Sequence, residues 1–297
     1  MTEVIMLGPA DVRSLADRLG VYPTKKLGQN FVHDANTVRK IVALAKVQPG
    51  ETVLEVGPGL GSLTLGLVEA DADVIAVEID KRLAAELQTT IAGRTRGRRI
   101  TVVSGDALAL RELPAQPVRL VANLPYNISV PVLLHLLEHF ASIRSGVVMV
   151  QAEVGHRLAA EPGSKVYGSP SVKAAWYGQW KVVGTVSRSV FWPVPNVDSV
   201  LIGFERWPVE MGRGIDPAIN PAGFEASEQL RKHMFEIIDR AFGQRRKMLR
   251  QALAIVYGSP ELATRALEAA DIDPTMRGEQ LGIDAYIRLA RTDLARA

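Results

Sequence analysis

Between Glu51 and Gln151, short runs of apolar residues alternate with amphipathic stretches, and this alternation constrains the fold more than any other feature of the chain. The β-branched run Thr52–Val56 ends in glycines, and Ser62–Glu69 then has the pattern of a helix, with Ser62 near its N-cap. Further strands are predicted at 74–77, 100–103, 118–122 and 147–150, and further helices at 81–91 and 131–140. Strands and helices in alternation predict an α/β fold with a parallel sheet and helices on both faces.

The pattern changes after Gln151. Residues 174–186 and 200–205 are strand-like, and a proline-rich segment separates them, which predicts a terminal antiparallel pair on the parallel sheet. Residues 207–224 are rich in Gly and Pro and are interpreted as a linker. Helices are predicted beyond it at 226–242, 245–257, 260–269 and 283–294. We therefore expect one domain over residues 1–206 and a small helical domain over 207–297.

Composition sets only broad limits on function. The formal net charge of +3 and the pI near 9.1 allow a nucleic-acid partner without requiring one. The chain has no cysteine, which excludes a disulfide scaffold and a thiolate metal site, and no metal is expected. No apolar run approaches the roughly 18–20 residues of a membrane helix, and the first residues lack the pattern of a signal peptide. A cytoplasmic protein is expected.

A glycine-rich turn follows the first strand of the alternating segment. It reads Glu55-Val56-Gly57-Pro58-Gly59-Leu60-Gly61 and leads into a helix, so that a ligand can approach the backbone closely at the carboxyl end of the strand. The second strand ends at Glu78, placed to accept hydrogen bonds from ribose hydroxyls. Asp106 follows the third strand and could meet an adenine amino group.

These residues alone leave the ligand open. A glycine turn with a distant acid also describes nicotinamide dinucleotide sites, and a tight turn without a ligand is a further possibility. Two details favour S-adenosylmethionine. The spacing is G-x-G-x-G rather than G-x-G-x-x-G, and Glu55 near the turn suits a sulfonium and an amino acid better than a pyrophosphate.

The fourth strand ends in Asn123-Leu124-Pro125-Tyr126, a sequence that suits methylation of an exocyclic amine. The Asn123 side-chain oxygen and the Leu124 carbonyl can both accept hydrogen bonds from the amine and aim its lone pair at a methyl group. Pro125 fixes the direction of that carbonyl, and Tyr126 offers a face on which a base can stack. The alternative is an ordinary strand-ending turn, for which Asn and Pro are common.

A second aromatic candidate opens the proline-rich segment Phe191-Trp192-Pro193-Val194-Pro195. Phe191 could cover the other face of the base, with Trp192 as the neighbouring alternative. Simple packing is the competing interpretation for both.

Several segments together resemble the KsgA-type ribosomal RNA adenine N(6),N(6)-dimethyltransferases over roughly residues 20 to 255. The segments are Lys26 to Phe31, Glu55 to Gly61, Asn123 to Tyr126, Val150-Gln151 with Glu153 and Arg157-Leu158, Pro162 to Lys165 with Tyr167-Gly168, and Phe191 through Ser199. The resemblance implies a Rossmann-like, seven-stranded class I S-adenosylmethionine-dependent methyltransferase sheet. It also implies that residues 1–50 cover the cofactor and that residues 207–297 form an RNA-binding domain.

The resemblance assigns roles residue by residue. It implies that cofactor binding falls to Asn30, Val32, Gly57, Glu78, Asp106 and Asn123. It implies that the target adenine is held by Asn123, Leu124, Pro125, Tyr126 and Phe191. Members of the family dimethylate two adjacent adenosines in the 3'-terminal hairpin loop of 16S rRNA, late in the assembly of the 30S subunit.

The chain departs from the family pattern in the proline-rich loop. Asn196 stands where the family often carries Lys, and Trp192 is bulkier than the usual neighbour, so the RNA contacts of this loop are in doubt. The N-terminal extension before Asp11 has no assigned purpose.

Basic residues offer candidate contacts to RNA phosphates. A predicted helix carries Arg240, Arg245, Arg246, Lys247 and Arg250 without an acid. Further cations are Lys25, Lys26, Arg94, Arg96, Arg98 and Arg99. A solvated helix face is the alternative for any one cluster, and the resemblance favours Arg245, Arg246, Lys247 and Arg250 as the RNA-binding set.

Three other functions remain open. One is dimethylation of 23S rRNA of the kind that confers macrolide resistance, against which Leu124 and the Phe191 loop argue. Another is a nicotinamide-dependent oxidoreductase, although no acid or base for hydride transfer is apparent. The third is an assembly factor that binds the 30S subunit without catalysis. The expected partner is 16S rRNA within that subunit, and nothing in the sequence demands more than a monomer.

Overall fold

The computed structural model describes residues 4–21, 30–208 and 221–295. The strands of its main sheet are β2 (Thr52–Val56), β3 (Asp73–Glu78), β4 (Thr101–Ser104), β5 (Arg119–Asn123), β6 (Ser145–Gln151), β7 (Gly178–Val186) and β9 (Ser199–Arg206). They lie in the order β4-β3-β2-β5-β6-β9-β7. The five strands β2 to β6 pair in parallel, which confirms the α/β prediction.

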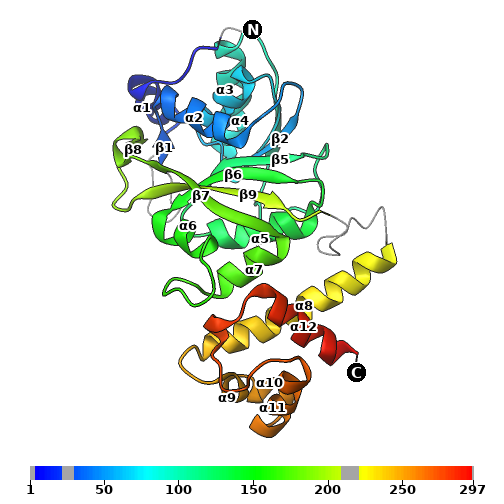
Figure 1. The fold of residues 1–297 in the computed structure, drawn as a ribbon. Coiled ribbons are helices and arrows are strands. Elements are labelled where there is room, and N and C mark those ends of the chain that lie inside the picture. The colour runs from blue at the N-terminus through cyan, green and yellow to red at the C-terminus, as the bar shows by residue number, and fades with distance from the viewer. Residues whose placement is uncertain (1–3, 22–29, 209–220, 296–297) are drawn as a thin grey trace. The chain divides into compact units, whose positions relative to one another are not determined.

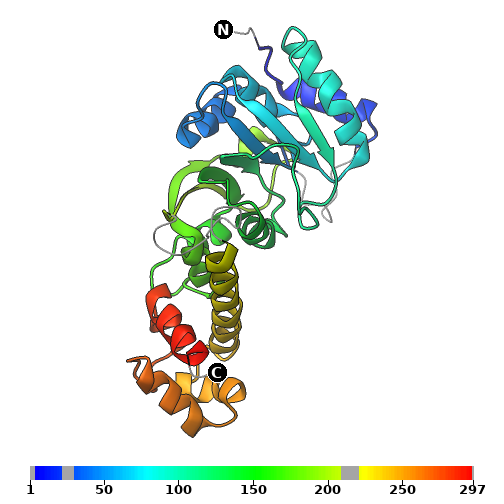
Figure 2. The same cartoon turned by 90° about the vertical axis from the view of Figure 1, so that its right-hand side faces the viewer.

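Helices cover both faces of this sheet. They are α2 (Ala35–Ala45), α3 (Ser62–Glu69), α4 (Lys81–Arg94) and α5 (Ser129–His139). Helices α2, α3 and α4 lie on one side and α5 on the other (Figure 1), and Figure 2 shows the twist of the sheet between them. Gly66 allows α3 to approach α2 closely, because a Cβ at this position would lie 2.3 Å from Val38 Cγ1.

The sheet ends in the predicted antiparallel strand. Strand β9 runs antiparallel to β6, with Ser145 opposite Glu205, and β7 occupies the edge beside β9. The strand predicted over 174–186 is wrong in its first four residues, which belong to the helix α7 (Ser169–Tyr177). Gly168 is the N-cap of this helix, and a proline stands in its first turn. The apolar run of α7 is as short as that of a buried strand, so the two cannot be distinguished by their pattern, and residues 174–177 were predicted as a strand.

A small two-stranded sheet joins distant parts of the chain. Strand β1 (Phe31–Val32) pairs antiparallel with β8 (Phe191–Trp192), which follows the short 3-10 helix η1 (Arg188–Val190). Val32 stands opposite Phe191 and Phe31 opposite Trp192. Strand β1 is therefore joined by backbone pairing to the proline-rich segment that begins at Phe191.

The N-terminal extension packs on the first part of the chain. Its Ile5 N–H donates to the Arg94 carbonyl at 3.0 Å and Leu7 is buried. The extension leads into the helix α1 (Pro9–Arg18), whose Asp11 accepts a 2.9 Å hydrogen bond from the Gly8 backbone N–H. Arg94 on α4 donates to the Asp11 carboxylate at 2.8 Å, and Val12 and Ala16 are fully buried. These contacts give the extension a structural place that the sequence did not reveal.

The helix α6 (Ala152–Leu158) lies between β6 and β7 in the chain. The described helices after β9 are α8 (Pro221–Gly243), α9 (Leu249–Ala252), α10 (Ala254–Tyr257), α11 (Pro260–Ala269), the 3-10 helix η3 (Gly278–Gln280) and α12 (Ile283–Leu294). The helices predicted at 226–242, 260–269 and 283–294 are confirmed. The helix predicted at 245–257 is wrong at its start, because residues 244–246 form a turn and Met248 has extended backbone as the N-cap of α9. Within the described ranges, no helix combines the length and apolar character needed to cross a membrane.

The chain divides into two compact units. One comprises Met1–Gly155 and Lys181–Arg206, and the other His156–Trp180 and Trp207–Ala297. The boundary predicted at 206/207 is one of the points where the chain passes between the units. Residues 156–180, which the prediction placed in the first domain, group with the second unit. The division into a catalytic and an RNA-binding domain stays a prediction.

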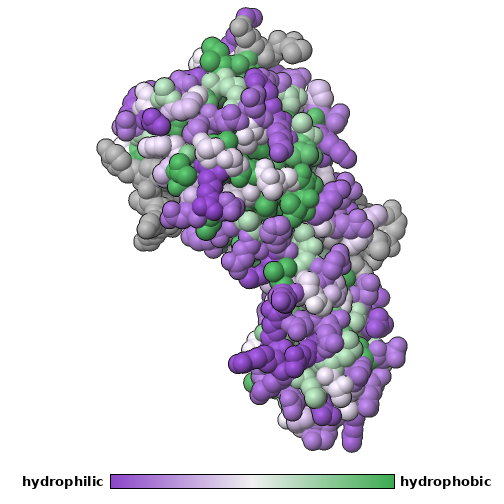
Figure 3. Space-filling view, turned by 60° about the vertical axis from the view of Figure 1, so that its left-hand side comes forward, coloured by the Kyte–Doolittle hydropathy of each residue, from purple (hydrophilic) through white to green (hydrophobic). Residues whose placement is uncertain are grey.

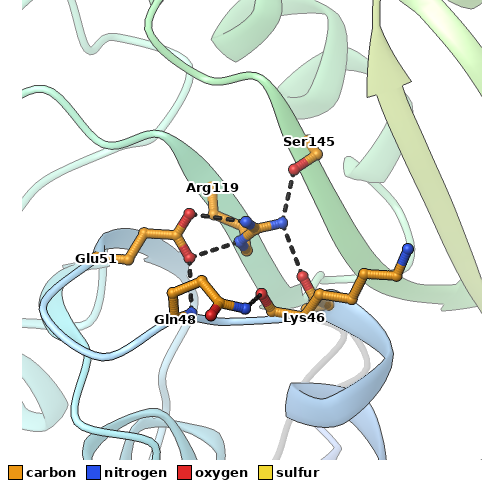
Figure 4. Close-up of polar contacts among 6 residues, drawn as sticks. Lys46, Gln48, Glu51, Arg119 and Ser145 are labelled. Atoms are coloured by element: carbon orange, nitrogen blue, oxygen red, sulfur yellow. Dashed lines mark hydrogen bonds and ion pairs between the residues drawn. The ribbon is translucent and has the colours of Figure 1, made fainter.

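An ionic network ties together the amino-terminal ends of the strands (Figure 4). Arg119, the first residue of β5, donates to both carboxylate oxygens of Glu51 at 2.7 and 2.8 Å. The same guanidinium donates to the Ala45 carbonyl at 2.8 Å and to Ser145 Oγ at 2.7 Å. One side chain thus links the end of α2 to the starts of β2, β5 and β6. These starts lie at the amino-terminal ends of the strands, whereas the glycine turn follows the carboxyl end of β2.

Candidate active site

A pocket lies at the carboxyl ends of the parallel strands. Its walls come from β1, the glycine turn, the ends of β2, β3 and β5, and the residues after β4. The pocket brings together all the predicted cofactor residues, namely Asn30, Val32, Gly57, Glu78, Asp106 and Asn123. Within the predicted cofactor-covering segment 1–50, residues 1–3 and 22–29, which include Lys26 to Gln29, lie outside the described residues.

The glycine turn has the conformation that the sequence implied. Gly57, Gly59 and Gly61 have φ of +69°, +57° and +94°, a region that side chains rarely adopt. A Cβ at Gly59 would lie 2.8 Å from the Phe31 ring, so the turn also needs glycine for space. A Cβ at Gly57 would lie 3.7 Å from the Asn123 carbonyl oxygen, which brings the turn against the Asn-Leu-Pro-Tyr segment.

Glu78, the last residue of β3, contacts the glycine turn. Its side chain is buried and accepts hydrogen bonds from the backbone N–H of Gly59 at 3.0 Å and of Asp80 at 2.9 Å. Burial raises the pKa of this carboxyl above its ordinary value despite these donors. Asp106 is exposed at the pocket, and its Oδ1 accepts from the Leu108 N–H at 2.9 Å. Both acids lie where the prediction requires, at the ends of adjacent strands.

Polar atoms without partners line the floor of the pocket. Glu55 is 1% exposed, and its Oε2 accepts a 2.7 Å hydrogen bond from Thr64 Oγ1. Its Oε1 and the Ser62 hydroxyl are buried and have no hydrogen-bond partner among the described residues. Buried polar groups are normally paired, so these two atoms indicate that a polar ligand belongs here. Sequence reasoning did not identify Ser62 as a pocket residue, nor Thr64 as the partner of Glu55 behind the pocket lining.

The amide of Asn123 is held by the backbone. Its Nδ2 donates a 3.0 Å hydrogen bond to the Asn30 carbonyl oxygen. In this orientation the side-chain NH₂ is engaged, and Oδ1 is the atom left to accept a hydrogen bond. The predicted acceptor role of Asn123 is therefore compatible with its position, and Asn30 contributes by its backbone.

The other residues of the motif have distinct environments. Leu124 is buried, and its backbone N–H donates to the Met149 carbonyl at 3.1 Å. The Tyr126 hydroxyl lies 2.6 Å from Ser199 Oγ, and burial raises the pKa of this phenol. Leu124 and Pro125 line the pocket. The hydrogen bond to Ser199 on β9 fixes one edge of the Tyr126 ring.

Phe191 is not at the pocket surface. It is 1% exposed and belongs to the hydrophobic core around α2 and α3. Trp192 is partly exposed, and its ring stacks on Phe31 with centroids 6.4 Å apart. The structure thus does not bring Phe191 together with the other predicted acceptor residues, and its stacking role stays a prediction.

The basic residues predicted to contact RNA lie in the turn between α8 and α9. Arg245, Arg246 and Lys247 are exposed, and Arg250 is half-buried on α9. Arg245 pairs with the Glu279 carboxylate and donates to the Lys165 carbonyl at 2.9 Å. The basic segment has no acidic neighbour in the sequence, but the fold brings Glu279 into contact with Arg245.

The other basic cluster is partly neutralised. Arg94 pairs with Asp11 and Arg98 with Asp71, while Lys25 and Lys26 lie outside the described residues. These ion pairs favour a structural role for Arg94 and Arg98. Within residues 4–21, 30–208 and 221–295, no three His, Asp or Glu side chains gather as a metal site would require.

Comparisons with known proteins agree with this architecture. A solved dimethyladenosine transferase from Plasmodium falciparum superimposes with a TM-score of 0.68 at 22% identity, covering 87% of this chain and 95% of that one. The solved 23S rRNA methyltransferase ErmE superimposes with a TM-score of 0.63 at 25% identity, covering 89% and 99%. The likeness shows the class I methyltransferase fold with a helical C-terminal region.

Sequence relatives are more specific than the fold. The ribosomal RNA small subunit methyltransferase A of Leifsonia xyli subsp. xyli is 62% identical, over 98% of this chain and 99% of the relative. The family model described as ribosomal RNA adenine dimethylase matches residues 23–216. With a pocket at the glycine turn and the Asn-Leu-Pro-Tyr segment beside it, the chain belongs to the ribosomal RNA adenine dimethylase family.

Proposed function

We propose that this chain transfers methyl groups from S-adenosylmethionine to two adjacent adenosines in the 3'-terminal hairpin loop of 16S rRNA. The substrate is the 30S subunit at a late stage of its assembly, and the chain acts as a monomer in the cytoplasm. The observation that carries the proposal is the position of the Asn123 amide, which is anchored to the Asn30 carbonyl at the pocket that the glycine turn forms.

The pocket residues fit the methyl donor. Glu78 and Asp106 supply carboxylates for the ribose hydroxyls and the adenine amino group, and Asn30, Val32 and Gly57 line the opposite part of the pocket. When bound, S-adenosylmethionine supplies a methyl carbon that the amine nitrogen attacks as the carbon–sulfur bond breaks and its electron pair passes to sulfur.

The acceptor segment prepares the amine for this attack. The lone pair of an adenine amine is delocalised into the ring, so the amine needs hydrogen-bond acceptors that hold it in a pyramidal geometry. Asn123 Oδ1 and the Leu124 carbonyl provide them, and Pro125 restricts the backbone between Leu124 and Tyr126. The methylated nitrogen then loses its proton to solvent, so no His or Lys is required in the motif.

The small subunit is favoured over the large one by the sequence relatives. The Leifsonia xyli relative named for the small subunit is 62% identical, whereas the solved 23S rRNA enzyme is 25% identical. Both share the fold, so the fold does not discriminate between them. The predicted RNA contacts Arg246, Lys247 and Arg250 supply phosphate affinity, and Arg245 holds their turn through Glu279.

A methyl-transfer assay on ribosomal particles tests this function. Radiolabelled S-adenosylmethionine and the purified chain are incubated with 30S particles that lack the modification, and separately with 50S precursors. We expect label in 16S rRNA only. Label confined to 23S rRNA would contradict the choice of substrate.

A second candidate is assembly without catalysis, which the cations at 245–250 favour because they and the pocket residues belong to different compact units. Asn123→Ala tests it. Loss of the anchored amide is expected to lower kcat by at least about 100-fold, as for other transition-state hydrogen bonds. Sedimentation with 30S particles should be unchanged; if the variant also fails to bind them, the separation of chemistry from docking is wrong.

A further inference from the structure

One buried carboxyl of the pocket has no role in the scheme above. Glu55 lies on β2 directly before the glycine turn, and none of the ion pairs formed by the described residues includes it. Its Oε2 accepts from the Thr64 hydroxyl, and its Oε1 is buried without a partner in the described part of the chain. Only one of its two carboxyl oxygens therefore has a hydrogen-bond partner among the described residues.

Ionisation of Glu55 in this place is unfavourable. A buried carboxylate requires a counter-charge or several donors, and Thr64 supplies one donor. Burial raises the pKa of Glu55 to about 8, and the nearby Glu78 carboxylate adds to the rise while the Thr64 hydroxyl opposes it. This raised pKa favours the neutral form of the carboxyl at pH 7.

The two forms of the ligand differ in charge at one atom. S-adenosylmethionine carries a sulfonium and an amino group, and its product S-adenosylhomocysteine keeps the amino group but has a neutral thioether. The sulfonium therefore adds a positive charge to the pocket beyond that of the amino group, which both ligands share, and the thioether does not.

We propose that Glu55 ionises when the sulfonium donor enters, so that it distinguishes the methyl donor from the spent product. The inference rests on the proposed function, since it takes S-adenosylmethionine as the ligand. The proton leaves Glu55 for the solvent when the donor binds, and a proton returns from the solvent once methyl transfer has converted the sulfonium to a thioether. Product release is thereby favoured between successive methyl transfers.

The neighbouring charges do not substitute for Glu55. Glu78 on β3 is held by the N–H groups of Gly59 and Asp80, and Asp106 after β4 is exposed at the pocket. Thr64 on α3 contacts Glu55 but carries no charge. Glu55 is the carboxyl that combines full burial with an unpartnered oxygen among the described pocket residues.

Calorimetric titration of the full chain tests the proposal. S-adenosylmethionine and S-adenosylhomocysteine are titrated at pH 6.5, 7.0 and 8.5 in buffers that differ in ionisation enthalpy. For the donor we expect the wild type to release close to one proton at pH 7, and its affinity to rise about 20-fold from pH 6.5 to 8.5. The thioether should release less than half as many protons.

Glu55→Gln keeps an acceptor for Thr64 and removes the titration. It should release no proton beyond that of the ligand's own amino group, and its preference for donor over product should fall. Glu69→Gln, at a partly exposed carboxylate paired with Arg39, is the matched control and should behave as the wild type.

The pH dependence of the free energy of unfolding, measured without added ligand, gives a second test. The folded-state pKa of Glu55 is raised, so its contribution to stability is complete below the unfolded pKa near 4.5 and is lost as pH rises to about 8. Urea titrations of the wild type should show this loss, and those of Glu55→Gln should not.

The outcomes are distinguishable. Proton release that is equal in Glu55→Gln and the wild type, or equal for donor and product, overturns the inference. Absence of donor binding by the wild type at every pH contradicts the proposed function itself.

Discussion

Asn123 and Asn30 are separated by 93 positions, yet one hydrogen bond joins them at the pocket. The sequence predicted Asn123 and Glu78 because each ends a strand of a parallel sheet, where such side chains meet. It could not predict Thr64 or Ser62, whose places depend on how α3 packs behind the turn. The burial of Phe191 also escaped prediction, because an aromatic residue in a proline-rich loop has the same local pattern whether it packs or stacks.

At the residue scale, Gly59→Ala tests the geometry of the turn. The new Cβ meets the Phe31 ring at 2.8 Å and forces a side chain into a positive φ. We expect a loss of about 2 kcal/mol of stability and weakened donor binding, measured by urea unfolding and calorimetry. Gly97→Ala is the control, since Gly97 also has positive φ but no atom within 4 Å of its Cβ. Equal effects on donor binding would contradict the importance of the Phe31 contact.

Substitutions of Phe191 test whether its ring only packs in the core or also stacks on the target base. Phe191→Ala should cost about 3–5 kcal/mol, because the side chain is fully buried. Phe191→Leu conserves most of the apolar volume and should cost about 1 kcal/mol. If the ring also stacks on the target base, Phe191→Leu will lower kcat with little change in stability. Unchanged kcat would leave Phe191 with packing alone.

At the scale of elements, the strands were predicted well because each combines a β-branched run with a glycine or polar residue at its end. The prediction failed at 174–177, where a buried helix and a buried strand have the same apolar run and only the Gly168 cap distinguishes them. It failed again at 245–247, where Arg and Lys suit a helix but Met248 adopts extended backbone.

The network around Arg119 is expected to stabilise the starts of three strands. Glu51→Gln removes the charge from a largely buried, two-point ion pair with side-chain exposures of 13% and 15%. We expect a loss of about 2 kcal/mol in the free energy of unfolding at pH 7. Glu69→Gln breaks the more exposed pair with Arg39 and should cost under about 0.5 kcal/mol.

The contribution of the Glu51–Arg119 ion pair to stability is expected to depend on pH. Burial opposes ionisation, but Arg119 and the Gln48 N–H hold the pKa of Glu51 below its ordinary value. The stabilisation is therefore present above the unfolded pKa and is lost as pH falls through the folded pKa. The difference between wild type and Glu51→Gln should shrink toward acid pH. A difference that is constant with pH would argue against an ionic contribution.

At the scale of the whole molecule, the proposed function places the chemistry in one unit, and the predicted RNA contacts belong to the other. The face of the helical unit visible in Figure 3 is mostly hydrophilic, as a surface that contacts a polyanion needs to be. Arg246→Ala and Lys247→Ala should each weaken binding to 30S particles and lower the salt slope of binding by about one. Arg265→Ala on α11, also exposed, is the control and should leave the slope unchanged. Equal slopes in all variants would place the RNA contacts elsewhere.

The most direct test of the central claim is mass spectrometry of rRNA from a bacterial strain that lacks its own enzyme and expresses this chain. We expect N(6),N(6)-dimethyladenosine at two adjacent positions of the 3'-terminal hairpin of 16S rRNA. When the chain carries Asn123→Ala, we expect unmodified adenosine at both positions. Dimethylation found only in 23S rRNA, or at both 16S positions with Asn123→Ala, would contradict it.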